Sequence, residues 1–167
     1  DKARLDDIAQ EAGIAKGSIY HYFGSKQEIY ERLLNNVKGQ INFEAEMMGD
    51  EPASKRMEHL LRLRLKTTVE YPLEVGLLAR ELVRMEGPAG EWAREDPKRY
   101  LVAIRHIIIQ GQKTGEFRAV DPDVLASTIF GILAHLPNWY RLSSRIQPES
   151  LVDEIIDFIM AGLLIKK

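Results

Sequence analysis

The sequence predicts an all-α protein that consists of a small N-terminal head and a larger helical body. Apolar residues return at spacings of three and four along most of the chain, and no segment combines strand-like alternation with a hairpin turn. Glycine and proline interrupt this pattern at intervals typical of separate helices. The 167 residues suffice for a head and a body with its own core. We expect the boundary at Gly49–Pro52, which gives domains over 1–48 and 49–167.

Two short helices open the chain. The first is expected over 7–12 and ends at Gly13, a residue that adopts a left-handed turn conformation without steric cost. The second is expected over 15–23, where Ile19 and Phe23 return at helical spacing. Two short helices joined by a tight turn that contains glycine form a helix-turn-helix, whose second helix fits the major groove of DNA.

A longer helix connects the head to the body. Ser25 is a favourable N-cap, and Glu28 completes a capping box three residues later. Apolar residues continue the helical period from Ile29 to Phe43, so this helix is expected to run to about Met48.

The body is expected to contain five further helices. Proline opens or breaks most of them, and Gly115 ends one. We expect a loop over 86–90 and a helix start at Asp96-Pro97. The predicted helices span 53–71, 73–85, 98–114, 123–144 and 148–165.

The last two helices are apolar over more than one face. A helix of that kind needs packing partners on two sides. One partner would be the core of the same chain and the other a second subunit, although a deeper single-chain core would give the same pattern. The residues expected at a homodimer interface are Ile129, Leu133, Leu136, Ile155, Ile159 and Leu163.

The head resembles the DNA-binding domain of the TetR family of bacterial repressors. The resemblance rests on Asp7-Ile8-Ala9, Ala12-Gly13, the run Tyr20-His21-Tyr22-Phe23 and Ser25-Lys26, all in register. It implies a homodimeric, ligand-responsive transcriptional regulator that binds a palindromic double-stranded DNA operator and is released by a small effector. It also implies a further helix ahead of Asp1. Activation in place of repression would be compatible with the same motif.

The same motif implies which residues approach DNA. Lys16 can donate to guanine in the major groove, and Gly17 permits close backbone approach. The alternative is a solvated helix with unrelated polar residues. Arg4 stands where the family usually has threonine, so it could contact a phosphate but not cap the helix. The implied DNA-binding residues are Arg4, Lys16, Gly17, Ser18, Tyr20, His21, Tyr22 and Lys26.

The body also carries weaker resemblances. The run GQKTGEFR over 111–118 is similar to a pattern of TetR ligand domains, and residues 138–141 and 149–162 are similar to regulators of fatty-acid and steroid degradation. Those regulators respond to acyl-CoA thioesters, so an acyl-CoA or another apolar effector is implied. Ordinary core packing would explain any one of the candidate lining residues, which are Met57, Leu61, Leu78, Leu82, Met85, Ile104, His106, Ile108, Phe130 and Trp139.

Composition argues against several other classes. The chain has no cysteine, and its four histidines show no metal-ligand spacing, so we expect no metal and no cofactor. No HExxH, GxSxG or phosphate loop is present, and we expect no enzyme and no catalytic residue. No apolar run is long enough for a membrane span, and we predict a cytoplasmic protein. The rival hypotheses are a helical carrier or enzyme without DNA binding, and a helical interaction protein.

Overall fold

The fold is all-α, as predicted. The computed structural model describes residues 5–38, 49–80, 82–140 and 146–165, and these ranges contain no strand. A single isolated bridge joins Phe117 to Leu164 within them. The helices are α1 (Leu5–Glu11), α2 (Lys16–Tyr22), α3 (Lys26–Lys38), α5 (Ala53–Glu70), α6 (Pro72–Arg80), the 3₁₀ helix η1 (Leu82–Arg84), α7 (Gly87–Lys113), α8 (Pro122–Tyr140) and α9 (Pro148–Leu163).

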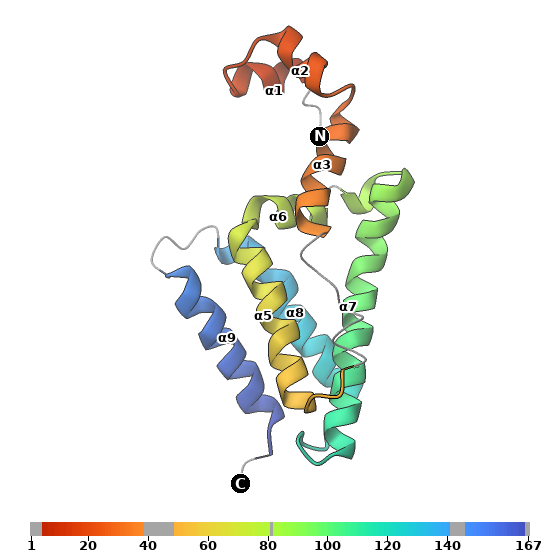
Figure 1. Cartoon of the computed structure of the whole chain (residues 1–167), viewed down its shortest axis with the longest axis vertical. Coiled ribbons are helices and arrows are strands. Elements are labelled where there is room, and N and C mark those ends of the chain that lie inside the picture. The colour runs from red at the N-terminus through yellow and green to blue at the C-terminus, as the bar shows by residue number, and fades with distance from the viewer. Residues whose placement is uncertain (1–4, 39–48, 81, 141–145, 166–167) are drawn as a thin grey trace.

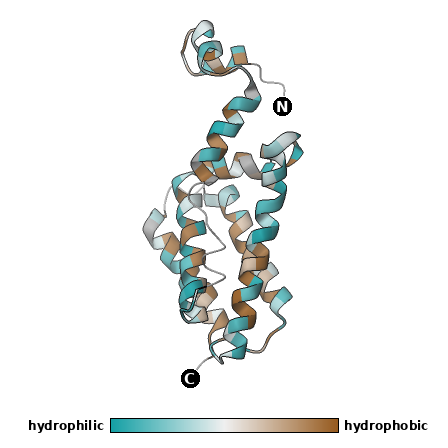
Figure 2. Cartoon of the chain, turned by 45° about the vertical axis from the view of Figure 1, so that its right-hand side comes forward, coloured by the Kyte–Doolittle hydropathy of each residue, from teal (hydrophilic) through white to brown (hydrophobic). Residues whose placement is uncertain are grey.

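The body is a bundle in which α5, α7, α8 and α9 run along the long axis of the molecule (Figure 1). Helix α5 packs against α7, α8 and α9, and α7 packs against α8. Their apolar faces turn inward, while polar residues cover much of the outside (Figure 2). The head lies at one end of the long axis, and α3 descends from it to α6 and α7.

The head contains the predicted pair of short helices. Leu5, Ala9 and Ile19 are buried between α1 and α2. Gly13 ends α1 with a φ of 66°, which is the left-handed conformation that glycine adopts most readily. The amide of Ile14 donates to the carbonyl of Ala9 at 3.0 Å, so the turn closes back on the helix.

The predicted cap of the connecting helix is confirmed. The amide of Glu28 donates to the hydroxyl of Ser25 at 3.2 Å, and the Glu28 carboxylate accepts from the amide of Gly24 at 2.8 Å. Together with the neighbouring Arg32, that amide bond lowers the pKa of Glu28. The predicted end near Met48 lies outside the described residues.

Two predicted boundaries in the body are wrong. The helix expected over 73–85 ends at Arg80 and is followed by η1, while the loop and break expected at 86–97 belong to α7. Pro97 lies inside α7, which continues because Ala93 and Tyr100 are buried on either side of it. Tertiary packing therefore overrides the usual helix-breaking effect of proline.

The linker between η1 and α7 passes close to the first turn of α7. A Cβ atom on Gly90 would lie 1.8 Å from the carbonyl oxygen of Met85, so only glycine fits at this crossing. Arg94 donates to the carbonyls of Val83 and Met85 at 3.1 and 3.0 Å, which satisfies the end of η1.

Helices α8 and α9 begin within a residue of their predicted starts. The predicted end of the first of them, at residue 144, falls outside the described residues. Twenty buried side chains from α5, α7, α8, α9 and Phe117 form one apolar core, which explains why these helices carry so many apolar residues.

A glutamate from the turn after α7 caps the start of α5. Glu116 accepts hydrogen bonds from the amides of Ala53 and Ser54, each at 3.0 Å, and from the hydroxyls of Ser54 at 2.7 Å and Thr114 at 2.9 Å. Burial by itself would raise the pKa of Glu116, but these hydrogen bonds outweigh it and lower the pKa to about 2. The run over 111–118 therefore fastens the end of α7 to the start of α5.

Glu116→Gln is expected to lower the free energy of unfolding by about 1–3 kcal/mol at neutral pH, because the amide loses the charge-assisted bonds. The folded-state pKa lies below the ordinary value of 4.5, so this stabilisation is full above pH 4.5 and is lost as the pH falls toward 2. Urea unfolding at pH 7 and pH 3 measures both effects, and the difference between variant and wild type should shrink at pH 3. Glu95→Gln, which removes an exposed pair with Lys98, is the control and should change stability little.

Candidate DNA-binding face and ligand cavity

Helix α2 presents its polar residues outward, as a groove-reading helix requires. Ile19 holds the helix to the head, with 2% of its surface exposed. Tyr20 and Tyr22 are 50% and 63% exposed, so Tyr20 is not a core residue. The other predicted contact residues of this helix, Lys16, Gly17, Ser18 and His21, are also exposed.

Lys16 is held by an acidic neighbour. Its ammonium group lies 2.5 Å from a carboxylate oxygen of Asp6, and 66% of the lysine side chain remains exposed. An exposed pair of this kind is worth little, so a phosphate or guanine can compete for the lysine. The predicted contacts of Arg4 and the Lys26 side chain lie outside the described residues.

Arg32 fixes the end of the recognition helix, a role that the motif did not reveal. From α3 it donates to the carbonyl of Tyr22 at 3.0 Å, pairs with Glu28 at 2.9 Å and lies 4.9 Å from the centre of the Phe23 ring. A cation at a helix C-terminus also interacts favourably with the helix dipole. The sequence did contain one indication of the ion pair, because Glu28 and Arg32 are four residues apart and therefore share a helix face.

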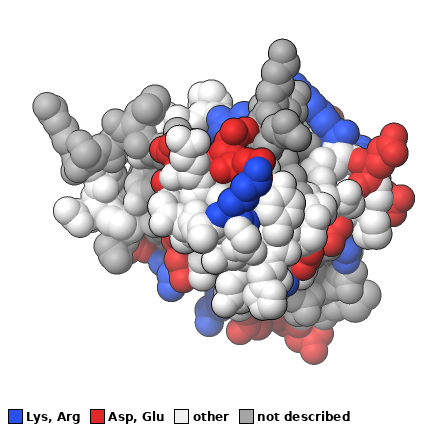
Figure 3. All heavy atoms as spheres, turned by 90° about the horizontal axis from the view of Figure 1, so that it is seen from above, with Lys and Arg blue, Asp and Glu red and all other residues white. Residues whose placement is uncertain are grey.

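Charge on the head is mixed. Seen from the head end, the basic groups are few and several lie beside acidic groups (Figure 3). Lys16 and Asp6 are one such pair. Since non-specific DNA affinity depends on phosphate neutralisation, one copy of the described head offers little of it.

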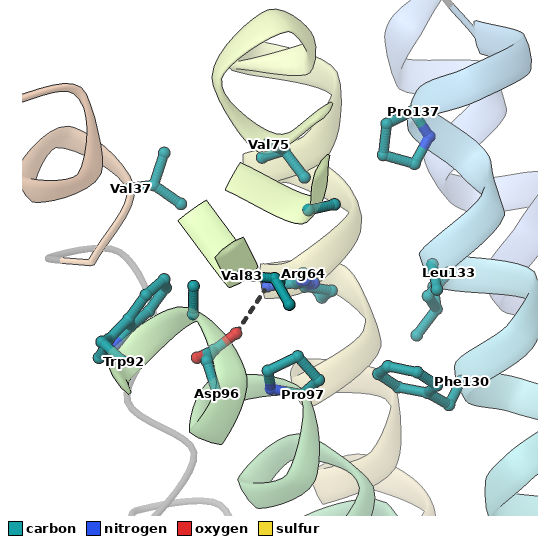
Figure 4. A pocket seen from close by; sticks show the side chains of 13 residues that line it. Val37, Arg64, Val75, Val83, Trp92, Asp96, Pro97, Phe130, Leu133 and Pro137 are labelled. Carbon is teal, nitrogen blue, oxygen red and sulfur yellow. Dashed lines mark hydrogen bonds and ion pairs between the residues drawn. The ribbon is translucent and has the colours of Figure 1, made fainter. Parts of the chain in front are cut away.

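A cavity of about 140 Å³ lies between α3, the helix that connects the head to the body, and the bundle. We call α3 the head-bearing helix. Helices α3, α5, α6, α7 and α8 and the η1 segment all contribute to its wall, which is mainly apolar (Figure 4). The lining residues are Val37, Arg64, Val75, Ala79, Val83, Trp92, Ala93, Asp96, Pro97, Phe130, Leu133, Ala134 and Pro137.

One ion pair supplies the charged groups of the cavity wall. Arg64 lies 3.5 Å from Asp96, and their side chains are 17% and 9% exposed. The guanidinium also sits 5.6 Å from the centre of the Tyr100 ring, whose burial raises the pKa of that phenol. The two opposite charges compensate each other, so the cavity carries no net charge from this pair.

Most of the residues predicted to line a pocket do not line this cavity. Only Phe130 of the predicted set lines this cavity, and the side chains of Leu78 and Leu82 are outside the described part of the chain. Met85 belongs to the apolar cluster beside the cavity, and Trp139 and His106 lie elsewhere on the helices. The remaining four are completely buried core residues: Met57, Leu61, Ile104 and Ile108. Helical period marks a side chain as inward but does not distinguish a filled core from a cavity wall.

The residues predicted at the dimer interface lie in or against the core of the single chain. Side chains of α5 and α7 already occupy the face that the sequence assigned to a second subunit. Ile155 is partly buried against that core, and the other five are buried within it: Ile129, Leu133, Leu136, Ile159 and Leu163. Exposed apolar side chains remain on other faces of these helices, at Val124 of α8 and Phe158 of α9.

The described residues contain no cluster of three histidine, cysteine, aspartate or glutamate side chains suited to a metal ion. No helix in the described ranges is long and apolar enough to cross a membrane.

Two family models match the chain in succession. Residues 1–33 match the model described as bacterial regulatory proteins, tetR family, and residues 50–163 match the tetracyclin repressor-like C-terminal domain. Residues 34–49 lie between the two matches.

Curated relatives are regulators of similar length. An uncharacterized HTH-type transcriptional regulator, YdgC of Bacillus subtilis, is 23% identical over 98% of this chain and 84% of its own. The HTH-type transcriptional repressor KstR2 of Mycobacterium tuberculosis is 23% identical over 94% of this chain and 80% of its own.

Solved structures share the fold. The ketosteroid transcriptional regulator KstR2 of M. tuberculosis superposes with a TM-score of 0.82 at 20% identity, covering 98% of this chain and 86% of that one. AibR, solved with isovaleryl coenzyme A and operator DNA, superposes with a TM-score of 0.69 at 18% identity, over 93% and 86% of the two chains.

Proposed function

Because this chain belongs to the TetR family of bacterial transcriptional regulators, we propose that it represses transcription as a homodimer and leaves its operator when a small effector fills the cavity. Members of this family are regulators and not enzymes. The DNA-binding part would span 1–48, and the ligand-binding and dimerisation part would span 49–167. Two heads would occupy successive major grooves about 34–36 Å apart.

The observation that carries the proposal is a wall shared by the cavity and the head-bearing helix. Val37 lies on α3, is 1% exposed and lines the cavity. It belongs to an apolar cluster with Leu34, Val75, Ala89 and Ala93, which joins α3 to α6 and α7. A ligand that displaces Val37 would therefore shift α3 and change the spacing of two linked heads.

The outward faces of α8 and α9 are the proposed dimer surface. Phe158 is 73% exposed on α9, and Val124 is 58% exposed on α8. A Cβ atom added to Gly131 on α8 or to Gly162 on α9 would meet no other atom within 4 Å, which leaves space for close helix approach.

The effector is proposed to be small and largely apolar, and the structure of AibR with isovaleryl coenzyme A makes acyl-CoA thioesters one candidate class. A cavity of about 140 Å³ encloses roughly one benzene-sized group, so only the acyl end of such a ligand would fit. Addition of isovaleryl-CoA to the operator complex tests this class directly.

Lys16→Ala is expected to weaken operator binding by about 1–3 kcal/mol, because it removes a donor to guanine, and Tyr22→Ala should weaken it less if it contacts phosphate. Fluorescence anisotropy of the full-length protein with DNA from upstream of its own gene measures both effects, with unrelated DNA for comparison. The salt dependence separates specific from non-specific binding.

Lys98→Ala is the matched control, since Lys98 pairs with Glu95 on the body as Lys16 pairs with Asp6 on the head. It should leave operator affinity unchanged. Unchanged affinity in both head variants would refute the contact assignment. Equal, weak binding to the upstream and unrelated DNA would count against the repressor and favour a helical carrier.

A further inference from the structure

Both helix-interior prolines of the described chain line the cavity. Pro97 lies inside α7 and Pro137 lies inside α8, and each belongs to the cavity wall. Figure 4 shows the Pro97 ring on α7 and the Pro137 ring on α8 at the cavity wall. Every other proline in a described helix stands in its first turn, where the missing amide would have no helical partner.

Each of these prolines deprives one carbonyl of its usual helical donor. In an α-helix the carbonyl of residue i−4 accepts from the amide of residue i, and proline has no amide hydrogen. The affected carbonyls are those of Ala93 in α7 and Leu133 in α8, and both residues also line the cavity. Residues four apart share a helix face, so Ala93 lies beside Pro97 and Leu133 lies beside Pro137 at the cavity wall.

We propose that the cavity binds a compact, uncharged ligand that is mostly apolar and donates hydrogen bonds to the carbonyls of Ala93 and Leu133. Its volume corresponds to about one six-membered ring with a short substituent. A hydroxyl or amide N–H supplies the donor. A charged ligand is disfavoured, because Arg64 and Asp96 already neutralise each other and an added charge would be buried without a counterion.

The assignment of the cavity as the effector site rests on the proposed function, whereas the chemistry of the ligand does not. It also separates two effector chemistries. The carbonyl and sulfur of an acyl thioester offer no donor to the two backbone acceptors, whereas a small alcohol, phenol or amide does. The inference therefore favours a neutral donor over an acyl group as the enclosed part of the effector.

Four probes of one ring size test the ligand class: phenol, toluene, benzoate and benzylamine. Dissociation constants come from NMR titration up to about 10 mM, a range suited to such small ligands, with the Trp92 indole at the cavity wall as reporter. A dry cavity without acceptors would favour toluene, because burial of an unpaired hydroxyl is costly. We expect phenol to bind roughly threefold to tenfold tighter than toluene, and both charged probes to bind more weakly than either.

Restoring the two amides tests the acceptors. Pro97→Ala combined with Pro137→Ala returns a helical donor to each carbonyl, and alanine is the most favourable helix residue, so the variant should fold. The ratio of phenol to toluene affinity should fall to about one or below, while toluene still binds. Pro88→Ala is the matched control: Pro88 is exposed in the first turn of α7, and the wild-type ratio should persist.

Three results would overturn the inference. They are a preference of the wild type for toluene or a charged probe, an unchanged ratio in the double variant, and no saturable binding of any probe. The titrations contain no DNA, so failure to bind an operator would refute the proposed repressor without affecting this result. Phenol selectivity without operator binding would keep the ligand chemistry and reject the regulatory role.

Discussion

Gly111→Ala is expected to lower the free energy of unfolding by about 2–4 kcal/mol. A Cβ at this position would lie 2.2, 2.6 and 2.7 Å from three atoms of the Phe117 ring, which is 1% exposed. The ring cannot move away easily, since the amide of Phe117 donates to the Gly111 carbonyl at 3.0 Å and the next amide bonds to Leu163 at 2.9 Å. Expelling the phenyl ring would forfeit much of its burial energy.

Urea unfolding followed by circular dichroism measures this loss. Gly17→Ala is the control, because no atom lies within 4 Å of its added Cβ, and alanine is the better helix former. Gly111→Ala combined with Phe117→Leu provides a further test: the smaller side chain should relieve the clash, so the double variant should be more stable than additivity predicts. Wild-type stability in Gly111→Ala alone would refute the predicted packing.

Phe158→Glu is expected to convert the dimer to a monomer and to reduce operator affinity by a factor on the order of 10² or more. The side chain is 73% exposed in the single chain, so the substitution removes little core packing. In a symmetric dimer it would place two added charges at one interface, where like charges and lost apolar contact both oppose association. Unlinked heads would then lose the gain in effective concentration that a bivalent protein has.

Size-exclusion chromatography with light scattering measures the mass, and fluorescence anisotropy measures operator binding. Leu73→Glu is the control, since Leu73 is also largely exposed, at 61%, but belongs to α6 and not to the proposed dimer surface on α8 and α9. It should leave the dimer intact. A Phe158→Glu protein that remains dimeric would place the interface elsewhere, and a monomeric wild type would reject the dimer itself.

Local signals in the sequence predicted the head well. Gly13 specifies a left-handed turn, and Ser25 with Glu28 specifies a helix start, because each acts through neighbours within a few residues. The order of the body helices followed from the helical spacing of their apolar residues and from the prolines and glycines between them. The head motif also predicted the family, which the two domain matches show.

The tertiary structure decided what depends on distant partners. The local sequence predicts a helix start at Pro97. In the structure α7 continues through Pro97, because the helical segments before and after it are both packed against the body. Leu133 reads as a residue of a subunit interface, but α5 and α7 lie against it. Glu116 caps a helix more than sixty residues earlier in the chain. The cavity likewise depends on side chains from six elements.

Sequence alone therefore determined the fold class, the helix-turn-helix and the family, because these follow from residues a few positions apart. Which apolar face fills the core, which lines a cavity and which remains outside is decided by the helices that pack against it. Helical period shows that a side chain is apolar and turned to one side, but it does not identify the neighbour. Only the packed bundle placed Val37 of the head-bearing helix at the cavity wall.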